Sequence, residues 1–317
     1  MKLKWLSFIG FLLIIYLIYT AGVNNIITSL SNANLGLLLI AFLFNFITIF
    51  LKSEKWRYLI KLQGFGDYNW FKSFLTWIVG LAYGVITPSR SGEVMKIFYL
   101  KKQLDMPKTK GLISIIADKV IDIFSLILIA TFGSLAFVSS KGFELSFFIV
   151  AYFVILCIGL IFFNFMIKNK NFFLKMLKPI KHFSKSFHEK IINSYENILS
   201  AYKIYTKNPK KLLFSLFLSL TSWLLVYFQG FIITQAFSMD ISLIQVLSVF
   251  PISTLVSILP ISIAGLGTRE ATLLFLLPNI SLSSIIPMSL VLSIISIWIP
   301  TLIGFLISNL SYLERKD

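Results

Sequence analysis

Cysteine and histidine are scarce in this sequence, and each shortage excludes a class of site. One cysteine, Cys157, stands among the 317 residues, so an internal disulfide is excluded. The two histidines, His182 and His188, lie in a polar stretch without a nearby cysteine or paired acids, which argues against a metal site of ordinary ligand spacing. No Walker A or glycine-rich nucleotide-binding pattern occurs, so the chain is not by itself an ATP-driven pump. We therefore expect no metal and no cofactor.

Charge is also scarce. Charged residues make up 13% of the chain and hydrophobic residues 57%, with 32 phenylalanines and a mean hydropathy of +0.86. A soluble domain carries about 25% charged residues, so the composition indicates an integral membrane protein with little left for a separate soluble domain. The net charge of +16 would otherwise suggest nucleic acid. No nucleic-acid recognition motif is present, and basic residues beside apolar spans set topology and meet anionic lipid headgroups.

Six long apolar segments predict full transmembrane helices. They are residues 5–21, 33–51, 112–138, 143–167, 212–237 and 282–310. The first follows a basic start, as a signal peptide does, but no convincing small-residue cleavage site follows it, so we interpret it as a retained helix. Residues 22–32 form an uncharged connection. The predicted fold class is an all-α polytopic membrane protein, in a single membrane domain over residues 1–317.

Two further apolar segments are interrupted, one in each half of the chain. Residues 70–99 break at Pro88, and residues 251–277 break at Pro260 and the glycines after it. The ionisable residues of the two breaks are Arg90, Glu93, Arg269 and Glu270. Ionisable residues flanked by hydrocarbon-soluble sequence are costly and indicate a functional site. Interrupted segments at corresponding places in two halves point to a transporter's binding site.

Lysine placement predicts how these segments cross the membrane. The amino terminus and the basic connection of residues 52–72 are expected in the cytoplasm, because basic loops stay on that side. The lysines of residues 96–110 stay inside only if the first interrupted segment enters and turns back. The same reasoning at the second interrupted segment places the carboxyl terminus inside. The result is six spans and two re-entrant helical hairpins entering from opposite faces, in an inverted repeat of residues 33–138 and 212–310.

Residues 168–211 form the one extended polar stretch, with 11 lysines against Glu189 and Glu196. Apolar residues recur at helical spacing over residues 173–205, opposite a lysine-rich face. Such a basic, cytoplasmic, amphipathic helix fits the membrane interface against anionic lipid. Packing on the cytoplasmic ends of the spans explains the pattern equally well, and both interpretations stay open.

The two breaks form the candidate binding site. A broken helix at membrane depth exposes backbone groups that are tolerated only where they line a cavity or are buried in protein. Arg90 and Arg269 add planar donor forks suited to phosphate, and the helix after each break directs its amide dipole at the same place. Glu93 and Glu270 would orient the arginines or engage a cationic part of the ligand. The alternative is a pair of structural Arg–Glu clamps that fix the hairpins.

Asp118 and Asp122 lie on one face of the third span, at i and i+4. Three placements of these carboxylates stay open: they line the same cavity, they are solvated, or they pair with Arg57 or Lys96. If the acids of this site converge, they could do general acid–base work. A membrane-embedded transferase acting on a lipid-linked substrate is therefore an alternative function. A structural or regulatory membrane partner without transport is a third.

Four stretches resemble a known family. They read SEKWRYLI, TPSRSGEVMKIFYLKK, ADKVIDIFSL and LPISIAGLGTREATLLFLL. Together they resemble the transmembrane region of lysylphosphatidylglycerol synthetases, a family that includes stand-alone flippase-like proteins and the flippase domain of the multiple peptide resistance factor. The resemblance covers about residues 33–310 and implies translocation of a phospholipid or lipid-linked molecule. The site residues carried over by motif are Arg90, Glu93, Arg269 and Glu270.

The chain also departs from that family. The two-part synthetases continue into a soluble aminoacyl-transferring domain, whereas this sequence stops at Asp317, so we do not expect it to aminoacylate lipid itself. Where the family often has Glu-Arg in the third span, this sequence has Asp118-Lys119, which keeps the charges of the pair.

The sequence thus predicts a transporter, not an enzyme, in the cytoplasmic (inner) membrane, with both termini in the cytoplasm. An anionic headgroup would enter a polar cavity between the hairpins while the acyl tails stay in lipid. The substrate is an aminoacyl-phosphatidylglycerol, another anionic phospholipid or a polyprenyl-phosphate lipid, and the sequence does not decide among them. Nucleic acid is not expected as a partner, and a homo-oligomer is compatible with the sequence.

Overall fold

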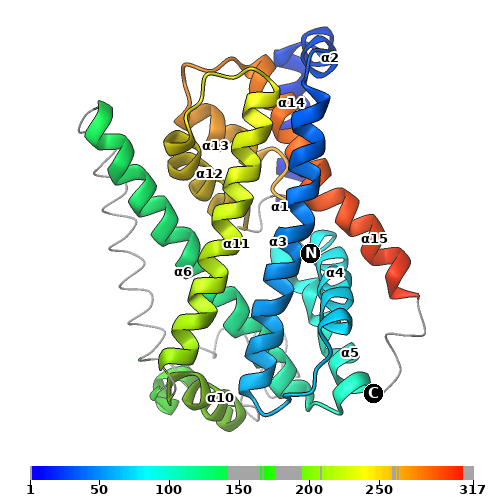
Figure 1. Cartoon of the computed structure of the whole chain (residues 1–317), viewed down its shortest axis with the longest axis vertical. Helices are drawn as coiled ribbons and strands as arrows, with labels where there is room; N and C mark the ends of the chain where they lie inside the picture. The colour runs from blue at the N-terminus through cyan, green and yellow to red at the C-terminus, as the bar shows by residue number, and fades with distance from the viewer. Residues whose placement is uncertain are drawn as a thin grey trace.

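The structure is a computed structural model that describes residues 2–141, 165, 168–175, 195–207, 209–258, 262 and 264–309. Within these residues the regular structure is helical throughout and no strand occurs, which agrees with the predicted all-α class (Figure 1). Most of the predicted span at residues 143–167, the middle of the 168–211 segment and the tail after residue 309 lie outside the described residues.

The helices follow one another along the chain in a fixed order. They are α1 (Lys2–Ala21), α2 (Val23–Ser31), α3 (Leu35–Leu62), α4 (Trp70–Val85), the 3₁₀-helix η1 (Pro88–Val94), α5 (Met95–Leu104), α6 (Lys108–Lys141), α10 (Tyr195–Lys207), α11 (Pro209–Ala236), α12 (Leu243–Ile258), α13 (Thr268–Leu276), α14 (Leu282–Ser293), the π-helix η2 (Ile294–Trp298) and α15 (Ile299–Ser308).

Three described helices are long and apolar enough to cross a membrane: α3, α11 and the continuous α14–η2–α15 helix. The bent pair of α1 and α2, which meet at 78°, gives a fourth span if it is counted as one. Most of the predicted uncharged connection at residues 22–32 is helical and forms α2. The predicted total of six spans stays a prediction.

The central helices α3 and α11 run side by side along the molecule (Figure 1). Each has 28 residues, about 42 Å at 1.5 Å per residue, which exceeds the roughly 30 Å of a bilayer core. Asn34 caps the start of α3 by accepting a hydrogen bond from the Leu37 amide at 3.2 Å. The predicted end of this span at residue 51 is wrong, because the helix continues through its basic stretch to Leu62.

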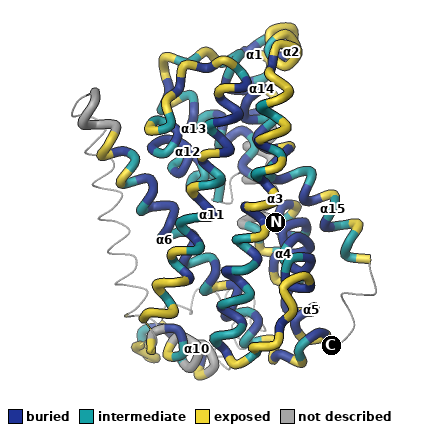
Figure 2. The backbone as a smooth tube through the Cα atoms, in the orientation of Figure 1, coloured by how far each residue is buried: buried dark blue, intermediate teal, exposed yellow. Residues whose placement is uncertain are grey.

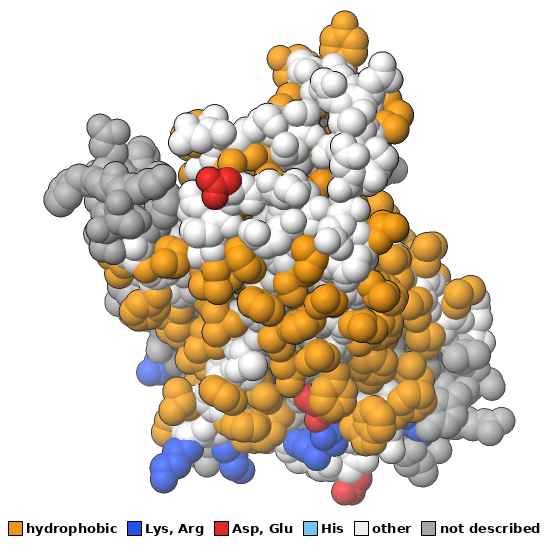
Figure 3. Space-filling model, turned by 45° about the horizontal axis from the view of Figure 1, so that its top comes forward, with side chains coloured by type: hydrophobic (Ala, Val, Ile, Leu, Met, Phe, Trp, Pro, Cys, Tyr) orange, Lys and Arg blue, Asp and Glu red, His pale blue; other side chains and the backbone are white. Residues whose placement is uncertain are grey.

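The exterior of the bundle is apolar and its polar residues point inward. On α3, Leu39, Leu43 and Phe46 are exposed, whereas Asn45 and Lys55 are buried. Figure 3 shows the hydrophobic side chains as a belt, with lysine and arginine gathered toward one end. Figure 2 shows buried and exposed residues alternating along the helices. This arrangement is the one expected of a chain solvated by lipid.

Both interrupted segments fold back as helical hairpins. In the first, the Gln103 side chain of α5 donates to Thr76 of α4 at 3.3 Å, and Gly80 of α4 faces Lys96 of α5. A Cβ on Gly80 would stand 2.5 Å from the Lys96 side chain, so glycine makes room for that lysine. In the second, α12 packs against α13. Figure 1 shows the two hairpins in opposite halves of the long axis.

Each hairpin packs against the last described helix of the other predicted repeat. Helix α4 contacts α15, and helix α12 contacts α6. A glycine lies at each of the two contacts. A Cβ on Gly304 of α15 would stand 2.6 Å from the Ile78 carbonyl oxygen. A Cβ on Gly133 of α6 would stand 2.5 Å from the Leu247 carbonyl oxygen. Glycine lets the backbones approach closely in both places.

Helix α10, from the predicted amphipathic segment, packs against the lysine-rich ends of α6 and α11. Tyr205 is buried there, accepts a hydrogen bond from Gln63 at 2.7 Å and donates one to the Leu59 carbonyl oxygen at 3.2 Å. Burial raises the pKa of the Tyr205 hydroxyl, which keeps it protonated as a donor. This part of the segment follows the packing interpretation. The predicted interface helix between residues 176 and 194 lies outside the described residues.

Candidate functional site

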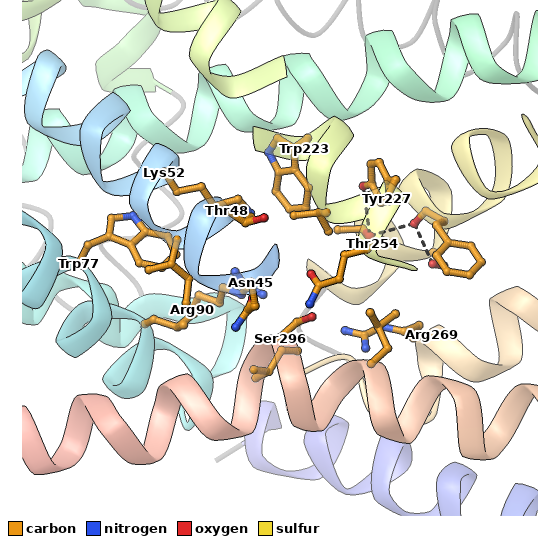
Figure 4. Close-up of a pocket in the computed structure, with 18 of the residues that line it drawn as sticks. Asn45, Thr48, Lys52, Trp77, Arg90, Trp223, Tyr227, Thr254, Arg269 and Ser296 are labelled. Atoms are coloured by element: carbon orange, nitrogen blue, oxygen red, sulfur yellow. Dashed lines mark hydrogen bonds between the residues drawn. The ribbon is translucent and has the colours of Figure 1, made fainter. Parts of the chain in front are cut away.

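A chamber whose wall carries charged and polar side chains among apolar ones lies at the centre of the bundle, between the two helix breaks (Figure 4). It has two adjoining lobes, of about 100 and 430 Å³. Six residues line both lobes, one from each of six helical segments. They are Lys52 (α3), Trp77 (α4), Arg90 (η1), Trp223 (α11), Thr254 (α12) and Arg269 (α13). The chamber is therefore the place where the two halves of the chain meet.

The first break is built to hold Arg90 in the chamber. Arg90 has a φ of 54°, a left-handed conformation that non-glycine residues rarely adopt. Thr87 holds the turn: its hydroxyl donates to the Gly84 carbonyl oxygen at 2.9 Å and accepts from the Gly92 amide at 2.7 Å. A Cβ on Gly92 would collide with the Tyr83 carbonyl oxygen. The Arg90 guanidinium has no hydrogen-bond or ion-pair partner among the described residues and lines both lobes.

Glu93 does not orient Arg90 as predicted. Its carboxylate lies 2.5 Å from the Lys119 ammonium and 2.9 Å from the Lys96 ammonium. Glu93 and the Lys96 side chain are almost fully buried, and Lys119 is partly exposed. The Glu93 carboxylate therefore has its ion-pair partners in Lys96 and Lys119. Arg90, the arginine of the same motif, does not pair with it.

The second break anchors both of its charged residues. Gly265 and Gly267 have φ values of 79° and 82°, which glycine adopts freely. Arg269 donates to the Ser293 hydroxyl at 2.7 Å. Glu270 is fully buried and accepts from the Gly267 amide at 2.6 Å and from the Ser289 hydroxyl at 2.5 Å. Glu270 thus caps the start of α13. The positive end of the α13 dipole, which was predicted to face the ligand, is neutralised by this carboxylate.

Asp118 and Asp122 share a buried lysine. Lys55 lies 2.8 Å from Asp118 and forms a second ion pair with Asp122. Asp122 also accepts from the Ser219 hydroxyl at 2.8 Å and from the Trp223 indole at 3.0 Å. Asp122 lines the larger lobe. The predicted partners were wrong, because Arg57 pairs with Glu54 and Lys96 pairs with Glu93.

Cations outnumber carboxylates around the chamber. The lining cations are Lys52, Arg90, Lys119 and Arg269, and the lining carboxylates are Glu93 and Asp122. Both carboxylates already have lysine partners. The Lys52 ammonium lies 3.5 Å from the centre of the Trp223 ring, a cation–π contact that holds it at the wall. Since charges interact more strongly where water is scarce, the chamber favours an anion.

Sequence reasoning missed several lining residues. Asn45, Thr48 and Lys52 line the smaller lobe from α3 and lie three and four residues apart, on one helix face with Lys55. That spacing was a readable signal, but ending the span at residue 51 assigned both lysines to a connection. Ser296 lines the smaller lobe from the π-helical turn η2, for which the sequence gives no comparable signal. No cluster of three or more His, Cys, Asp or Glu suited to a metal occurs among the described residues.

Comparison with known proteins agrees with the resemblance in the motifs. The chain is 26% identical to UPF0104 membrane protein MJ1595 of Methanocaldococcus jannaschii, over 95% of this chain and 92% of that protein. It is 24% identical to UPF0104 membrane protein PH1989 of Pyrococcus horikoshii, over 96% of each chain. The family described as "Lysylphosphatidylglycerol synthase TM region" matches residues 5–304. The chain therefore belongs to the family of the lysylphosphatidylglycerol synthase TM region, as an integral, multi-pass membrane protein.

Proposed function

We propose that the protein moves an anionic lipid between membrane leaflets, with the headgroup held in the chamber. The observation that carries this proposal is the convergence of Arg90 and Arg269, from two hairpins in opposite halves of the molecule, on one cavity. Guanidinium groups bind phosphate through paired hydrogen bonds. Lys52 adds a third cation to both lobes. A volume of about 430 Å³ in the larger lobe falls in the range of ligand pockets.

The charge distribution supports a definite orientation. The connections at residues 22–34, 237–242 and 277–281 contain one charged residue, Asp240. The opposite end carries a lysine cluster, which includes Lys101, Lys102 and Lys108. Because basic connections remain in the cytoplasm, the lysine-rich end faces the cytoplasm in the cytoplasmic membrane. The hairpins are then re-entrant, the first from the cytoplasmic face and the second from the outer face.

The apolar wall of the larger lobe fits the acyl chains. Val94 of η1 and Ile116 of α6 both line this lobe, and each is 41% exposed. Other apolar residues of α6 line the lobe beside them. The proposal places the acyl chains of a lipid along this apolar wall, with the headgroup at the cations of the chamber. No polar tail-binding site is needed.

The crossed packing of the hairpins supports alternating access. The contact of α4 with α15 repeats that of α12 with α6, as an inverted repeat of residues 33–138 and 212–310 requires. Rocking of one half against the other would then change which face of the chamber is closed. The arginines would remain at the centre throughout.

Transport of labelled lipid in proteoliposomes tests the proposal. Wild type is compared with Arg90→Ala and Arg269→Ala, using phosphatidylglycerol as the anionic lipid and phosphatidylcholine as the neutral one. Lys101→Ala is the matched control, because it removes one cation from an exposed position outside the chamber. We expect wild type and the control to move the anionic lipid. Both arginine variants should lose at least tenfold in rate, since a charge-assisted contact contributes about 1.5–3 kcal/mol.

Two results would contradict the proposal. Equal rates in all four proteins would exclude the chamber as the path. A lipid product of altered mass, formed in detergent without a second compartment, would support a membrane-embedded transferase instead.

A further inference from the structure

The helix Leu282–Ser308 changes its winding where it passes the chamber. Between α14 and α15 it forms the π-helical turn η2. The Ile299 amide donates there to the Ile294 carbonyl oxygen, five residues back instead of the four of an α-helix. Two residues of the turn, Ser296 and Ile297, line the smaller lobe. Turns of this kind are rare and occur frequently at functional sites.

A proline weakens the turn, and an asparagine from another helix holds it. Pro300 has no amide hydrogen, so it cannot donate to the Ile295 carbonyl oxygen five residues back. The buried side chain of Asn45, from α3, donates to that carbonyl oxygen at 2.9 Å. Figure 4 shows Asn45 and Ser296 on facing helices beside the chamber. A side-chain hydrogen bond therefore stands where a regular helix would use its own amide.

The two halves of this helix pack against different partners. Helix α15 is fixed to the first hairpin, because Gly304 brings its backbone close against α4. Helix α14 is joined to α13, since Ser289 donates to Glu270 at 2.5 Å and Ser293 accepts from Arg269 at 2.7 Å. Figure 1 shows α14 beside α2 toward one end of the molecule, and α15 beside α4. Any movement of α13 relative to the first hairpin must therefore be taken up at η2.

We propose that η2 is a hinge, on which α13 and α14 move as one body and carry Arg269 relative to the first hairpin. Ser293, which anchors Arg269, directly precedes the turn, so the guanidinium lies near the pivot and stays within the chamber during the movement. Asn45 is a positioning residue of the hinge, because its hydrogen bond favours the arrangement described. The role of the hinge in alternating access rests on the proposed function, whereas the hinge itself does not.

Two substitutions should change the hinge in opposite directions. Pro300→Ala supplies the missing amide hydrogen, and Asn45→Ala removes the donor to Ile295. Hydrogen–deuterium exchange of the amides of η2 is followed on the full chain in nanodiscs. We expect exchange about two- to tenfold slower in Pro300→Ala and about two- to tenfold faster in Asn45→Ala, since one neutral hydrogen bond is gained or lost. Pro287→Ala is the matched control, a buried proline of the same helix outside the turn, and should leave the rate unchanged.

The movement itself is measured by the distance between spin labels. The natural thiol is removed by Cys157→Ser. One pair joins Leu39→Cys of α3 to Phe275→Cys of α13, and the other joins Leu39→Cys to Leu302→Cys of α15; all three positions are exposed. In phosphatidylcholine nanodiscs the α13 pair should give the broader distribution of distances. Pro300→Ala should narrow it to the width of the α15 pair, and should slow lipid movement in proteoliposomes about two- to tenfold.

The outcomes separate the hinge from the proposed function. Equal widths for the two label pairs in wild type, or equal effects of Pro300→Ala and Pro287→Ala, would overturn the hinge. Exchange that is unchanged in Asn45→Ala would overturn the positioning role of Asn45. Lipid movement at the wild-type rate in Pro300→Ala, with the distribution narrowed, would overturn the role of the hinge in transport. A broad α13 distribution in a chain that moves no lipid would overturn the proposed function and leave the hinge standing.

Discussion

The two helix breaks contain the same pair of charged residues and use them differently. At the first break, the carboxylate of Glu93 is taken by Lys96 and Lys119, and the guanidinium of Arg90 is left without a described partner. At the second, Arg269 is held by Ser293 and Glu270 caps α13. Neither glutamate forms a salt bridge with its own arginine among the described residues. The Arg–Glu clamp suggested by the motifs is therefore not how the described structure is held.

The two hairpins therefore differ in how their arginines can bind a ligand. A guanidinium without a protein partner is available to a ligand at no cost in protein contacts. An anchored one binds a ligand only in the position that its anchor allows. We therefore expect ionic interactions to dominate the stability of the first break, and backbone capping to dominate that of the second.

Removing Glu93 should destabilise the protein most. Glu93→Ala leaves the buried Lys96 ammonium unpaired, and breaking a buried ion pair costs about 3–5 kcal/mol. The contribution of Lys119 is smaller, because its side chain is 35% exposed. Glu270→Ala should cost less, about 2 kcal/mol, because the hydrogen bonds that it removes come from the uncharged donors of Gly267 and Ser289, and no buried ammonium loses an ion-pair partner. Thermal unfolding in detergent measures both.

A double variant checks the cause. Glu93→Ala combined with Lys96→Met removes the stranded charge and should recover most of the lost stability. If the double variant is no more stable than Glu93→Ala, the ion pair is not the reason. If Glu270→Ala proves the more damaging substitution, the contrast between the breaks is reversed.

Both breaks require glycine, for different reasons. Gly92→Ala forces a methyl group against the Tyr83 carbonyl oxygen, so the turn that positions Arg90 must move; overpacking of this kind costs about 1–3 kcal/mol. Gly267→Ala must adopt a φ of 82° with a ψ of −48°, a sparsely populated conformation that costs about 1–3 kcal/mol. Gly111→Ala is the control, since its Cβ would meet Ile97 at an ordinary 3.4 Å. Unfolding temperatures equal to the control's would show that the turns are not constrained as described.

Much of the fold could be predicted from sequence, because a lipid environment requires long apolar helices. The breaks at Pro88 and at Gly265 and Gly267 were predictable because proline and glycine disfavour a helix interior. The carboxyl-terminal end of α3 was not, since Lys52 and Lys55 are typical of a cytoplasmic connection unless a buried partner is known. Asp118 and Asp122 supply that partnership from a distant helix.

The two arginines of the site could be predicted from the sequence, but the ion pairs and hydrogen bonds around them could not. Arg90 and Arg269 stand out because charge within apolar segments is rare, and both do line the chamber. Which lysine reaches Glu93 depends on the hairpin turn and on α6 lying beside it. The hydrogen bond from Gln229 to the Ala41 carbonyl oxygen depends on α11 lying against α3. Such contacts come from tertiary packing, which local spacing does not encode.

The smallest expected effect is on lipid affinity, and it tests whether Arg269 binds the ligand while it is bonded to Ser293. Ser293→Ala removes the hydroxyl that accepts from Arg269 at 2.7 Å, and should lower phosphatidylglycerol affinity about two- to tenfold, because the guanidinium loses its fixed position. Ser308→Ala, which removes a hydroxyl bonded only within the same helix, is the control. The sign of the change is the informative result. A rise in affinity would mean that the ligand must first pull Arg269 away from Ser293, so that both arginines act as free cations and the contrast between the two breaks would not extend to the bound state.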